Sequence, residues 1–435
     1  MIEARTLQGF SDFLPEAMYL RRYLSDTWRQ TFSAFGYGEL DTPSLEYEDI
    51  LMGKIGEDEK LIYRFVDNGD RHVALRYDQT VPLARVVVQH RNDLKMPFKR
   101  YQISKVWRAD SPRKGRKREF YQCDADIIGS NSPVADAEIL AVVSHGMKML
   151  GVENFVINLN HRGILKAMMK NWNIAAELQI QVFRAIDRFD KVGLDGVRQE
   201  LINRQIPVET HERILELLSW QERDSEKTLV WLEEKLGHFP EAQEGIENLR
   251  KIIVLSAAMG VKAENIFLNL NLVRGLDYYT GMVFEVTVPQ FGRTSLAGGG
   301  RYDRLTQSFS DADLPGVGVG IGFETLYELF QEHPIVFPST APEMLLIALD
   351  EQLLPTVADL ATQIRQTGKR VMMYAGGNEK LGKQLKYAND MNIKYVLILG
   401  ADEAKAGKIQ VKNMITGESM TVKLDEIVSK MSVMI

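Results

Sequence analysis

Apolar residues spaced three and four positions apart predict an amphipathic helix over residues 18–35. Gly36 follows directly, and glycine commonly ends a helix because it adopts the left-handed backbone conformation without strain. The helix is expected to bury a single apolar face that consists of Leu20, Tyr23, Leu24, Trp28, Phe32 and Phe35.

Alternating apolar and polar positions predict strands further along the chain. Residues 62–78 alternate on both sides of Asn68-Gly69, a dipeptide that tolerates the positive φ of a tight turn, and this predicts a β-hairpin. Pro43 places the segment 40–49 at a sheet edge or an interface, because proline cannot donate a hydrogen bond within a central strand. Further strands are predicted over residues 98–107, 119–129, 154–160, 265–273 and 282–288.

Three features divide the chain into domains. Residues 163–258 have a helical and highly charged pattern, which predicts an inserted helical subdomain. Three prolines within residues 332–343 indicate a linker, and beyond it apolar runs alternate with helical segments. That alternation predicts a small parallel sheet with crossover helices, closed by a hairpin and a short helix. We therefore expect one domain over residues 1–332, a linker over 333–342 and a second domain over 343–435.

The composition is that of an ordinary globular protein. The 435 residues carry a net charge of −6 and are 45% hydrophobic, which is enough for two or three packed domains. The single cysteine, Cys123, excludes an internal disulfide and a cysteine-rich metal site. The N-terminal residues lack the pattern of a signal peptide, and no apolar run approaches the ~18 residues of a membrane-spanning helix. A cytoplasmic location and no membrane partner are therefore expected.

Six of the eleven residues in the segment RADSPRKGRKR (108–118) are basic. A solvated surface loop is one explanation of such a run. The alternative is a site for phosphate groups or an RNA end, because a chain with net negative charge concentrates cations only at an electrostatic cost. The loop joins two predicted strands. These strands are unusually polar at positions that could face inward: Arg108, Gln122, Asp124 and Asp126.

Two further segments place polar residues within apolar sequence. LVRGLDYYTG (272–281) contains Arg274, which must be paired or must face a cleft, and a buried pair with Asp277 is the alternative to a site. LAGGGRYDRL (296–305) has three glycines that let a backbone or a ligand approach closely, and a tight turn is the alternative there. Both segments occur together with ALRYDQTVPLAR (74–85), and this combination is more informative than any segment alone.

Together these segments resemble the histidyl-tRNA synthetases, a family of class II aminoacyl-tRNA synthetases. DTPSLEY resembles the first class II motif and VWRADSPRKGRKREFYQCDADIIG the second, while RGLDYYTG and GGGRYD resemble two histidine-specific motifs. Residues 383–418 resemble the family's anticodon-binding domain, so the resemblance covers nearly the whole chain. It implies an α+β catalytic domain, with an antiparallel sheet of class II synthetase type and a helical insertion. It also implies a C-terminal α/β anticodon-binding domain with a mixed sheet.

The resemblance implies a two-step reaction and the residues that perform it. Histidine and ATP give histidyl-adenylate, and the histidyl group then passes to the 3′ end of tRNA(His). The catalytic residues implied are Arg108 and Arg274, since preorganised cations stabilise the charge that builds up at the α-phosphate. The implied histidine-binding residues are Asp78, Thr80, Gln122, Asp126, Arg274, Tyr278, Tyr279 and Tyr302. The implied ATP-binding residues are Arg108, Arg116, Phe120, Gly322 and Thr325.

Within the histidine site, the resemblance assigns different groups of the amino acid to different side chains. Asp78, Thr80 and Gln122 match the acceptors of the α-ammonium group, whereas Asp126 and Tyr279 match the partners of the two ring nitrogens. The family also implies a homodimer, Mg²⁺ that accompanies ATP without a dedicated protein cage, and no permanent cofactor or protein-bound metal.

One position departs from the family pattern. In GVGVGIGFETL (316–326) a threonine, Thr325, stands where the family's third motif has an arginine that contacts the γ-phosphate of ATP. One charge-assisted contact contributes roughly 1.5–3 kcal/mol. Its loss is therefore expected to lower the reaction rate, or the efficiency with which ATP is used, by about 10- to 150-fold. We hypothesise that Arg304, or a cation of the 113–118 loop, replaces the missing charge. The alternative for Arg304 is an ordinary solvated residue.

The missing arginine also keeps a second function open. A non-catalytic paralogue that binds histidine or tRNA as a regulator would not need it. The histidine motifs, the basic loop and the anticodon-type domain favour the enzyme, and RGLDYYTG disfavours a synthetase for another amino acid. Histidine-dependent ATP–pyrophosphate exchange distinguishes these possibilities.

Overall fold

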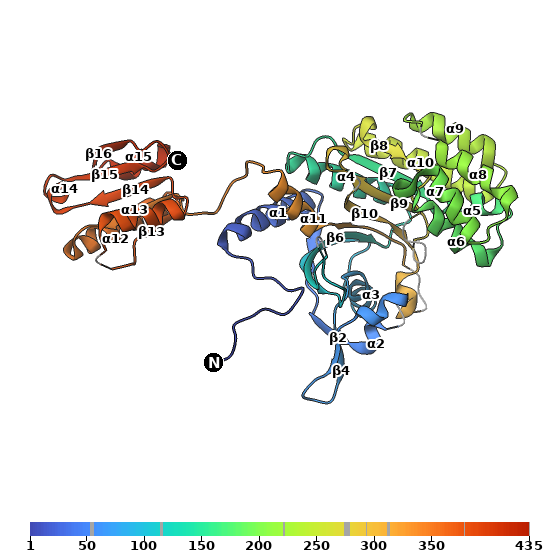
Figure 1. Cartoon of the computed structure of the whole chain (residues 1–435), viewed down its shortest axis with the longest axis horizontal. Helices are drawn as coiled ribbons and strands as arrows, with labels where there is room; N and C mark the ends of the chain where they lie inside the picture. Colours follow the sequence, from blue (N-terminus) through green and yellow to red (C-terminus); the bar gives the residue numbers. More distant parts are fainter. Residues whose placement is uncertain are drawn as a thin grey trace. The chain divides into compact units, whose positions relative to one another are not determined.

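A computed structural model of the chain describes residues 1–52, 56–113, 116–220, 222–273, 279–292, 294–310, 314–377 and 379–434. The chain divides into two compact units (Figure 1). The larger unit comprises residues 1–12 and 24–335, and the smaller unit comprises residues 13–23 and 336–435. None of the described helices combines the length and apolar character that a membrane crossing requires.

A mixed eight-stranded sheet organises the described part of the larger unit. Its central neighbours are antiparallel, and parallel pairs occur only at the two edges, between β1 and β5 and between β7 and β8. The strands lie in the order β1 (Gly38–Glu39), β5 (Phe98–Trp107), β6 (Glu119–Ile128), β11 (Gly316–Ile321), β10 (Ser295–Tyr302), β9 (Met282–Thr287), β7 (Val156–His161) and β8 (Ile266–Leu268).

The two faces of this sheet differ in chemistry, and β6 shows the difference most clearly. Cys123, Ala125 and Ile127 alternate along it as buried apolar residues on one face. α4 (Pro133–Met149) packs against β6, β10 and β11. The intervening Asp124 and Asp126 point to the other face and are nearly buried as well. Buried carboxylates need partners, so this second face is where a polar site is expected.

The predicted hairpin over residues 62–78 is confirmed. β3 (Arg64–Val66) and β4 (His72–Leu75) are antiparallel, and β2 (Leu45–Tyr47) pairs with the other side of β4. The segment that contains Pro43 thus leads into an edge strand, as its proline predicted. Its turn differs from the prediction, because Asp70 and not Asn68-Gly69 adopts the left-handed conformation, at φ 56°.

The prediction of a strand over residues 265–273 was too long, because β8 ends at Leu268. Two asparagines explain the early end. The Asn269 side chain accepts the backbone N–H of Asn271 at 3.0 Å and so favours a turn, and the Asn160 amide caps two carbonyls of the same turn.

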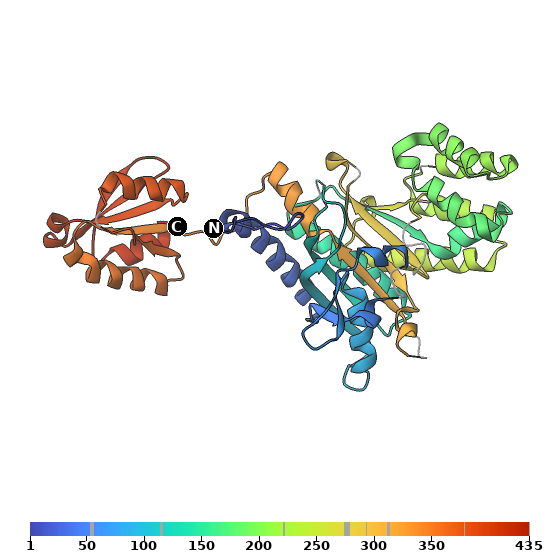
Figure 2. The ribbon, with the colours of Figure 1, turned by 60° about the horizontal axis from the view of Figure 1, so that its bottom comes forward.

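Six of the described helices follow one another between β7 and β8 along the chain and form the insertion. α5 and α10 pack against each other and against β7, while α9 packs on β8 (Figure 2). The insertion is therefore anchored at the β7–β8 edge of the sheet. Its helices are α5 (Arg162–Asn171), α6 (Ala176–Ile186), α7 (Phe189–Asn203), α8 (Val208–Ser219), α9 (Ser225–Leu236) and α10 (Pro240–Ala258).

Other helices flank the sheets. α1 (Pro15–Ala34) buries Leu20, Leu24, Trp28 and Phe32, and Gly36 beyond it has φ 77°, so the amphipathic helix and its end are confirmed. The boundary between the two units falls within α1, between Tyr23 and Leu24. The helices α2 (Glu48–Leu51), α3 (Thr80–Gln89) and α11 (Phe323–Glu332) belong to the larger unit.

The smaller unit has the mixed sheet that the sequence predicts. β13 (Val371–Met373), β12 (Met344–Ala348) and β14 (Tyr395–Leu399) are parallel, and β15 (Lys408–Asn413) and β16 (Ser419–Lys423) continue the sheet antiparallel. Two buried clusters cover its two faces, one with α12 and α15 and the other with α13. The helices are α12 (Leu354–Gln366), α13 (Leu381–Asp390), α14 (Ala401–Lys405) and α15 (Ile427–Met434).

Candidate active site

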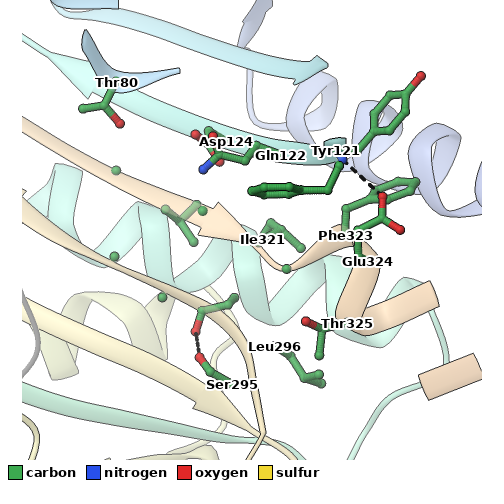
Figure 3. Close-up of a pocket in the computed structure, with 18 of the residues that line it drawn as sticks. Thr80, Tyr121, Gln122, Asp124, Ser295, Leu296, Ile321, Phe323, Glu324 and Thr325 are labelled. Carbon is green, nitrogen blue, oxygen red and sulfur yellow. Dashed lines mark hydrogen bonds between the residues drawn. The ribbon is translucent and has the colours of Figure 1, made fainter. Parts of the chain in front are cut away.

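A pocket of about 740 Å³ lies on the polar face of the larger sheet. It brings together residues that are more than 200 positions apart in the sequence (Figure 3). Asp78 does not line the pocket, and Arg274 and Tyr278 lie outside the described residues. The sequence-predicted residues that do line it are Thr80, Arg108, Arg116, Phe120, Gln122, Asp126, Tyr279, Tyr302, Gly322 and Thr325.

The alternating glycines of β11 create the floor of this pocket. Gly318 lies directly opposite Asp126 and Gly320 opposite Asp124 in the ladder between β11 and β6. A side chain at Gly318 would overlap the Asp126 carboxylate, and one at Gly316 would come within 2.6 Å of the Tyr302 ring. The glycines are therefore needed because two functional side chains occupy the space above them.

Asp126 is held in place from two sides. The Tyr302 hydroxyl donates a hydrogen bond to one carboxylate oxygen, and the other oxygen lies 2.6 Å from the guanidinium of Arg100, which is fully buried. Burial raises the pKa of Asp126, and the Arg100 charge opposes that shift. A carboxylate fixed in this way is a rigid acceptor, which suits recognition of an imidazole N–H.

Asp124 is a pocket residue with a strongly perturbed acidity. Its pKa is raised to about 7, mainly because the group is buried and also because the carboxylates of Asp126 and Asp78 lie nearby, while the charges of Arg100 and Arg108 oppose the shift. Burial also raises the pKa of Asp78, whose carboxylate accepts the Val81 N–H at 3.2 Å. Three carboxyl groups thus share one region, which favours a cationic ligand.

The raised pKa of Asp124 predicts that the unliganded protein loses stability as the pH rises. An unfolded aspartate titrates near ~3.9, so between that pH and about 7 the folded state binds the extra proton. The free energy of unfolding therefore falls across this window, by ~1.4 kcal/mol for each pKa unit of the shift. Asp124→Asn removes this contribution. The free energy of unfolding of the variant, measured with urea, should therefore rise relative to that of the parent between pH 5 and pH 7. A difference between the two free energies that stays constant across this range would contradict the assignment.

The basic loop, which connects β5 to β6, contributes cations to the same pocket. The Nε of Arg108 donates to the carbonyl of Tyr77 at 3.2 Å, and its guanidinium lies over the rings of Tyr77 and Phe120, at 4.3 and 5.2 Å from their centroids. These contacts fix a planar cation that faces the pocket. Arg116 pairs with Asp110 at 2.7 Å.

The position of the family's missing arginine lies at the start of α11. Thr325 lines the pocket there, beside Glu324, whose carboxylate accepts the backbone N–H of Tyr121 at 3.1 Å. Lys117 lies 3.9 Å from the same carboxylate and also lines the pocket. Arg304 is exposed and does not line it, so its location does not support the hypothesis that Arg304 supplies the missing charge.

Sequence reasoning gave no role to several residues in or next to the pocket. Asp124 was recognised only as a polar residue of the strand, and Lys117 only as one cation of the loop. Arg100 was missed, because nothing in a single sequence distinguishes an arginine that faces a buried carboxylate across a ladder from one that faces solvent. The period-two spacing of Gln122, Asp124 and Asp126 was the available signal, since it places all three on one face.

Comparisons with known proteins agree with this geometry. The family model described as Histidyl-tRNA synthetase matches residues 9–326, and the one described as Anticodon binding domain matches residues 343–434. The histidine–tRNA ligase of Rhodopirellula baltica is 38% identical and the match covers 97% of this chain and 96% of that protein. The histidine–tRNA ligase of Aeropyrum pernix is also 38% identical, with 98% and 97% covered.

Solved structures give the same result. A crystal structure of histidyl-tRNA synthetase from a Nostoc species has a TM-score of 0.90 and 30% identity, with both chains covered completely. A Bacillus halodurans structure, described as an ATP phosphoribosyltransferase regulatory subunit/histidyl-tRNA synthetase, shares the fold at a TM-score of 0.77 and 21% identity. The two family models, the near-complete relatives and the fold agree, and the chain belongs to the histidyl-tRNA synthetase family.

Proposed function

We propose that this chain activates L-histidine with ATP to form histidyl-adenylate and then transfers histidine to the 3′ end of tRNA(His). The observation that carries the proposal is a pocket that is lined both by buried carboxylates and by cations. Asp124 and Asp126 line it from β6, and Arg108, Arg116 and Lys117 line it from the basic loop. Such a pocket suits a ligand pair that combines an ammonium and an imidazole with a triphosphate.

The first step joins two anions, the histidine carboxylate and the α-phosphate. Arg108 and Arg274 hold this region and stabilise the negative charge that builds up when the carboxylate oxygen attacks phosphorus and pyrophosphate leaves. The stacking of Arg108 between aromatic rings supports its part of this role, because a preorganised cation needs no rearrangement during the reaction. Mg²⁺ enters with ATP as part of the substrate.

The amino acid is selected through its side chain. Asp126 and Tyr279 bind the two ring nitrogens, Tyr302 orients Asp126, and Tyr278 completes the pocket. The α-ammonium is bound by Thr80 and Gln122, together with Asp78. Isosteric apolar side chains would leave the polar groups of this pocket unpaired, which is the strongest basis for rejection that binding offers.

ATP occupies the remainder of the pocket. Arg116 contacts the outer phosphates and Phe120 stacks on adenine, which lies against the glycine strand near Gly322 and Thr325. The rest of the basic loop guides the acceptor end of the tRNA, the helical insertion contacts the acceptor stem, and the domain over residues 343–435 binds the anticodon. We propose that the protein acts in the cytoplasm.

The active form is proposed to be a homodimer. Exposed apolar side chains on the three-stranded sheet support this assembly, because a second copy would cover them: Leu45, Tyr47, Phe65 and Val66. Sedimentation or light scattering should give twice the mass of the chain, and a monomer at micromolar concentration would contradict it.

The deciding experiment is ATP–pyrophosphate exchange with each of the twenty amino acids, followed by aminoacylation of tRNA(His). Exchange that requires histidine, together with charging of the tRNA, is the expected outcome. Histidine binding without exchange would instead identify the regulatory paralogue. Exchange that depends on another amino acid would overturn the assignment of the substrate.

A further inference from the structure

A buried acceptor of the pocket has no assigned partner. The side chain of Asp124 lies on β6 next to that of Gln122 (Figure 3), and the residue is 6% exposed. Among the described residues, no donor makes a hydrogen bond to its Oδ1, and the same holds for the buried Oε1 of Gln122. Gly320 faces Asp124 across the ladder and places no side chain over the carboxylate, and both residues line the pocket.

An unsatisfied buried acceptor costs free energy unless a ligand supplies a donor. An ammonium group offers three N–H donors and a positive charge. Asp78 matches the family's acidic partner of this group, but it does not line the pocket, and its Oδ1 already accepts the Val81 N–H in the first turn of α3. The carboxylate that lines the pocket beside Gln122 is that of Asp124.

We propose that Asp124 is a further histidine-binding residue, whose carboxylate accepts hydrogen bonds from the α-ammonium group together with Gln122. The inference rests on the proposed function and deepens it. The charges of the described residues agree, because the carboxyl groups of Asp78, Asp124 and Asp126 lie near two guanidinium groups, those of Arg100 and Arg108, so a bound cation offsets negative charge. Asp124 therefore selects ligands that carry an α-amino group.

The test replaces Asp124 with asparagine, which keeps the shape and removes the charge. The Michaelis constant for histidine in pyrophosphate exchange should rise roughly 10- to 150-fold, as expected for loss of a charge-assisted bond, while that for ATP changes less than about twofold. Glu119→Gln is the matched control, since Glu119 begins the same strand, pairs with Lys105 outside the pocket and does not line it. An unchanged histidine constant in the Asp124 variant would overturn the proposal.

Two histidine analogues separate recognition from a structural effect. Histidinol keeps the ammonium and imidazole groups, whereas imidazolepropionate keeps the imidazole and carboxylate but lacks the ammonium. Asp124→Asn should weaken binding of histidinol, measured by calorimetry, and leave imidazolepropionate unchanged or tighter. Equal losses for both analogues would show a structural role and overturn the proposal. These measurements need no turnover, so they remain informative if the exchange assay shows no activity.

A second inference concerns the outer end of the pocket. The first turn of α11 presents Glu324, Thr325 and Glu328 to the pocket, which is an unfavourable wall for a triphosphate. Lys117 lines the pocket on this wall and lies 3.9 Å from Glu324, with its side chain 25% exposed. Its ammonium group carries the charge that a triphosphate needs at this wall.

The geometry points to Lys117 as the residue that binds the outer phosphates of ATP in place of the arginine that Thr325 replaces. Lys117→Met should raise the Michaelis constant for ATP roughly 10- to 150-fold and leave that for histidine within about twofold. Adding Thr325→Arg to this variant places a cation on the same wall and should restore ATP use. Arg304→Gly, outside the pocket, is the control. An unchanged ATP constant in Lys117→Met, or no rescue by Thr325→Arg, would overturn the assignment.

Discussion

Arg108→Gln should lower the maximal rate of histidine-dependent pyrophosphate exchange by roughly 10²- to 10³-fold, the usual effect of removing one preorganised group that stabilises transition-state charge. The guanidinium is held by the carbonyl of Tyr77 and by two aromatic rings, so it already has its orientation in the unliganded protein. Glutamine can still form hydrogen bonds, but it lacks the positive charge that stabilises the pentacoordinate transition state at the α-phosphorus. The rate should therefore fall more than the Michaelis constants change.

The control for Arg108 is Lys105→Gln, which removes a cation from the same strand. Lys105 pairs with Glu119 at 2.8 Å and does not line the pocket, so the exchange rate should stay within about twofold of the parent. Both variants should bind histidinol as the parent does. An Arg108 variant that keeps more than a tenth of the parent rate would mean that another group stabilises the α-phosphate.

The sequence predicted those parts of the fold that local patterns determine. The period-two pattern gave β5, β6 and β9 nearly to the residue, and the change to a helical period located the insertion over 163–258. Errors occurred where side chains compete with the backbone. Asn269 ends β8 early, and Asp67 accepts two N–H groups of the hairpin turn, so the left-handed residue moves to Asp70. Hydrophobic periodicity does not report such bonds.

The site was predictable in its residue types and not in its pairings. The motifs named Asp126 and Tyr302, but the hydrogen bond between them and the role of Arg100 depend on which residues face each other across four neighbouring strands, β5, β6, β11 and β10. The segment LAGGGRYDRL illustrates the limit. A tight turn was one of its interpretations, whereas the structure makes Ser295–Tyr302 a central strand. Arg301 in this strand does not face the pocket, and its guanidinium pairs with Asp136 of α4.

Breaking this buried pair is expected to destabilise the larger unit strongly. Asp136 is fully buried, and both of its carboxylate oxygens accept from Arg301, at 2.9 and 2.6 Å, while the same guanidinium donates to the carbonyl of Ser130 at 2.8 Å. Such a bidentate pair connects the first turn of α4 to β10, next to Tyr302. Removing one partner leaves the other charge buried and unpaired, which typically costs ~3–5 kcal/mol.

Arg301→Met should accordingly lower the free energy of unfolding by ~3–5 kcal/mol, and the double variant with Asp136→Leu should recover most of the loss, because two apolar side chains leave no buried charge. Tryptophan fluorescence in urea is a suitable probe, since all five tryptophans lie in the larger unit. Lys386→Met, which removes an exposed pair with Asp390, should change stability by less than about 1 kcal/mol. A double variant as unstable as Arg301→Met would show that the shapes of the two side chains, and not their charges, determine the stability at this site.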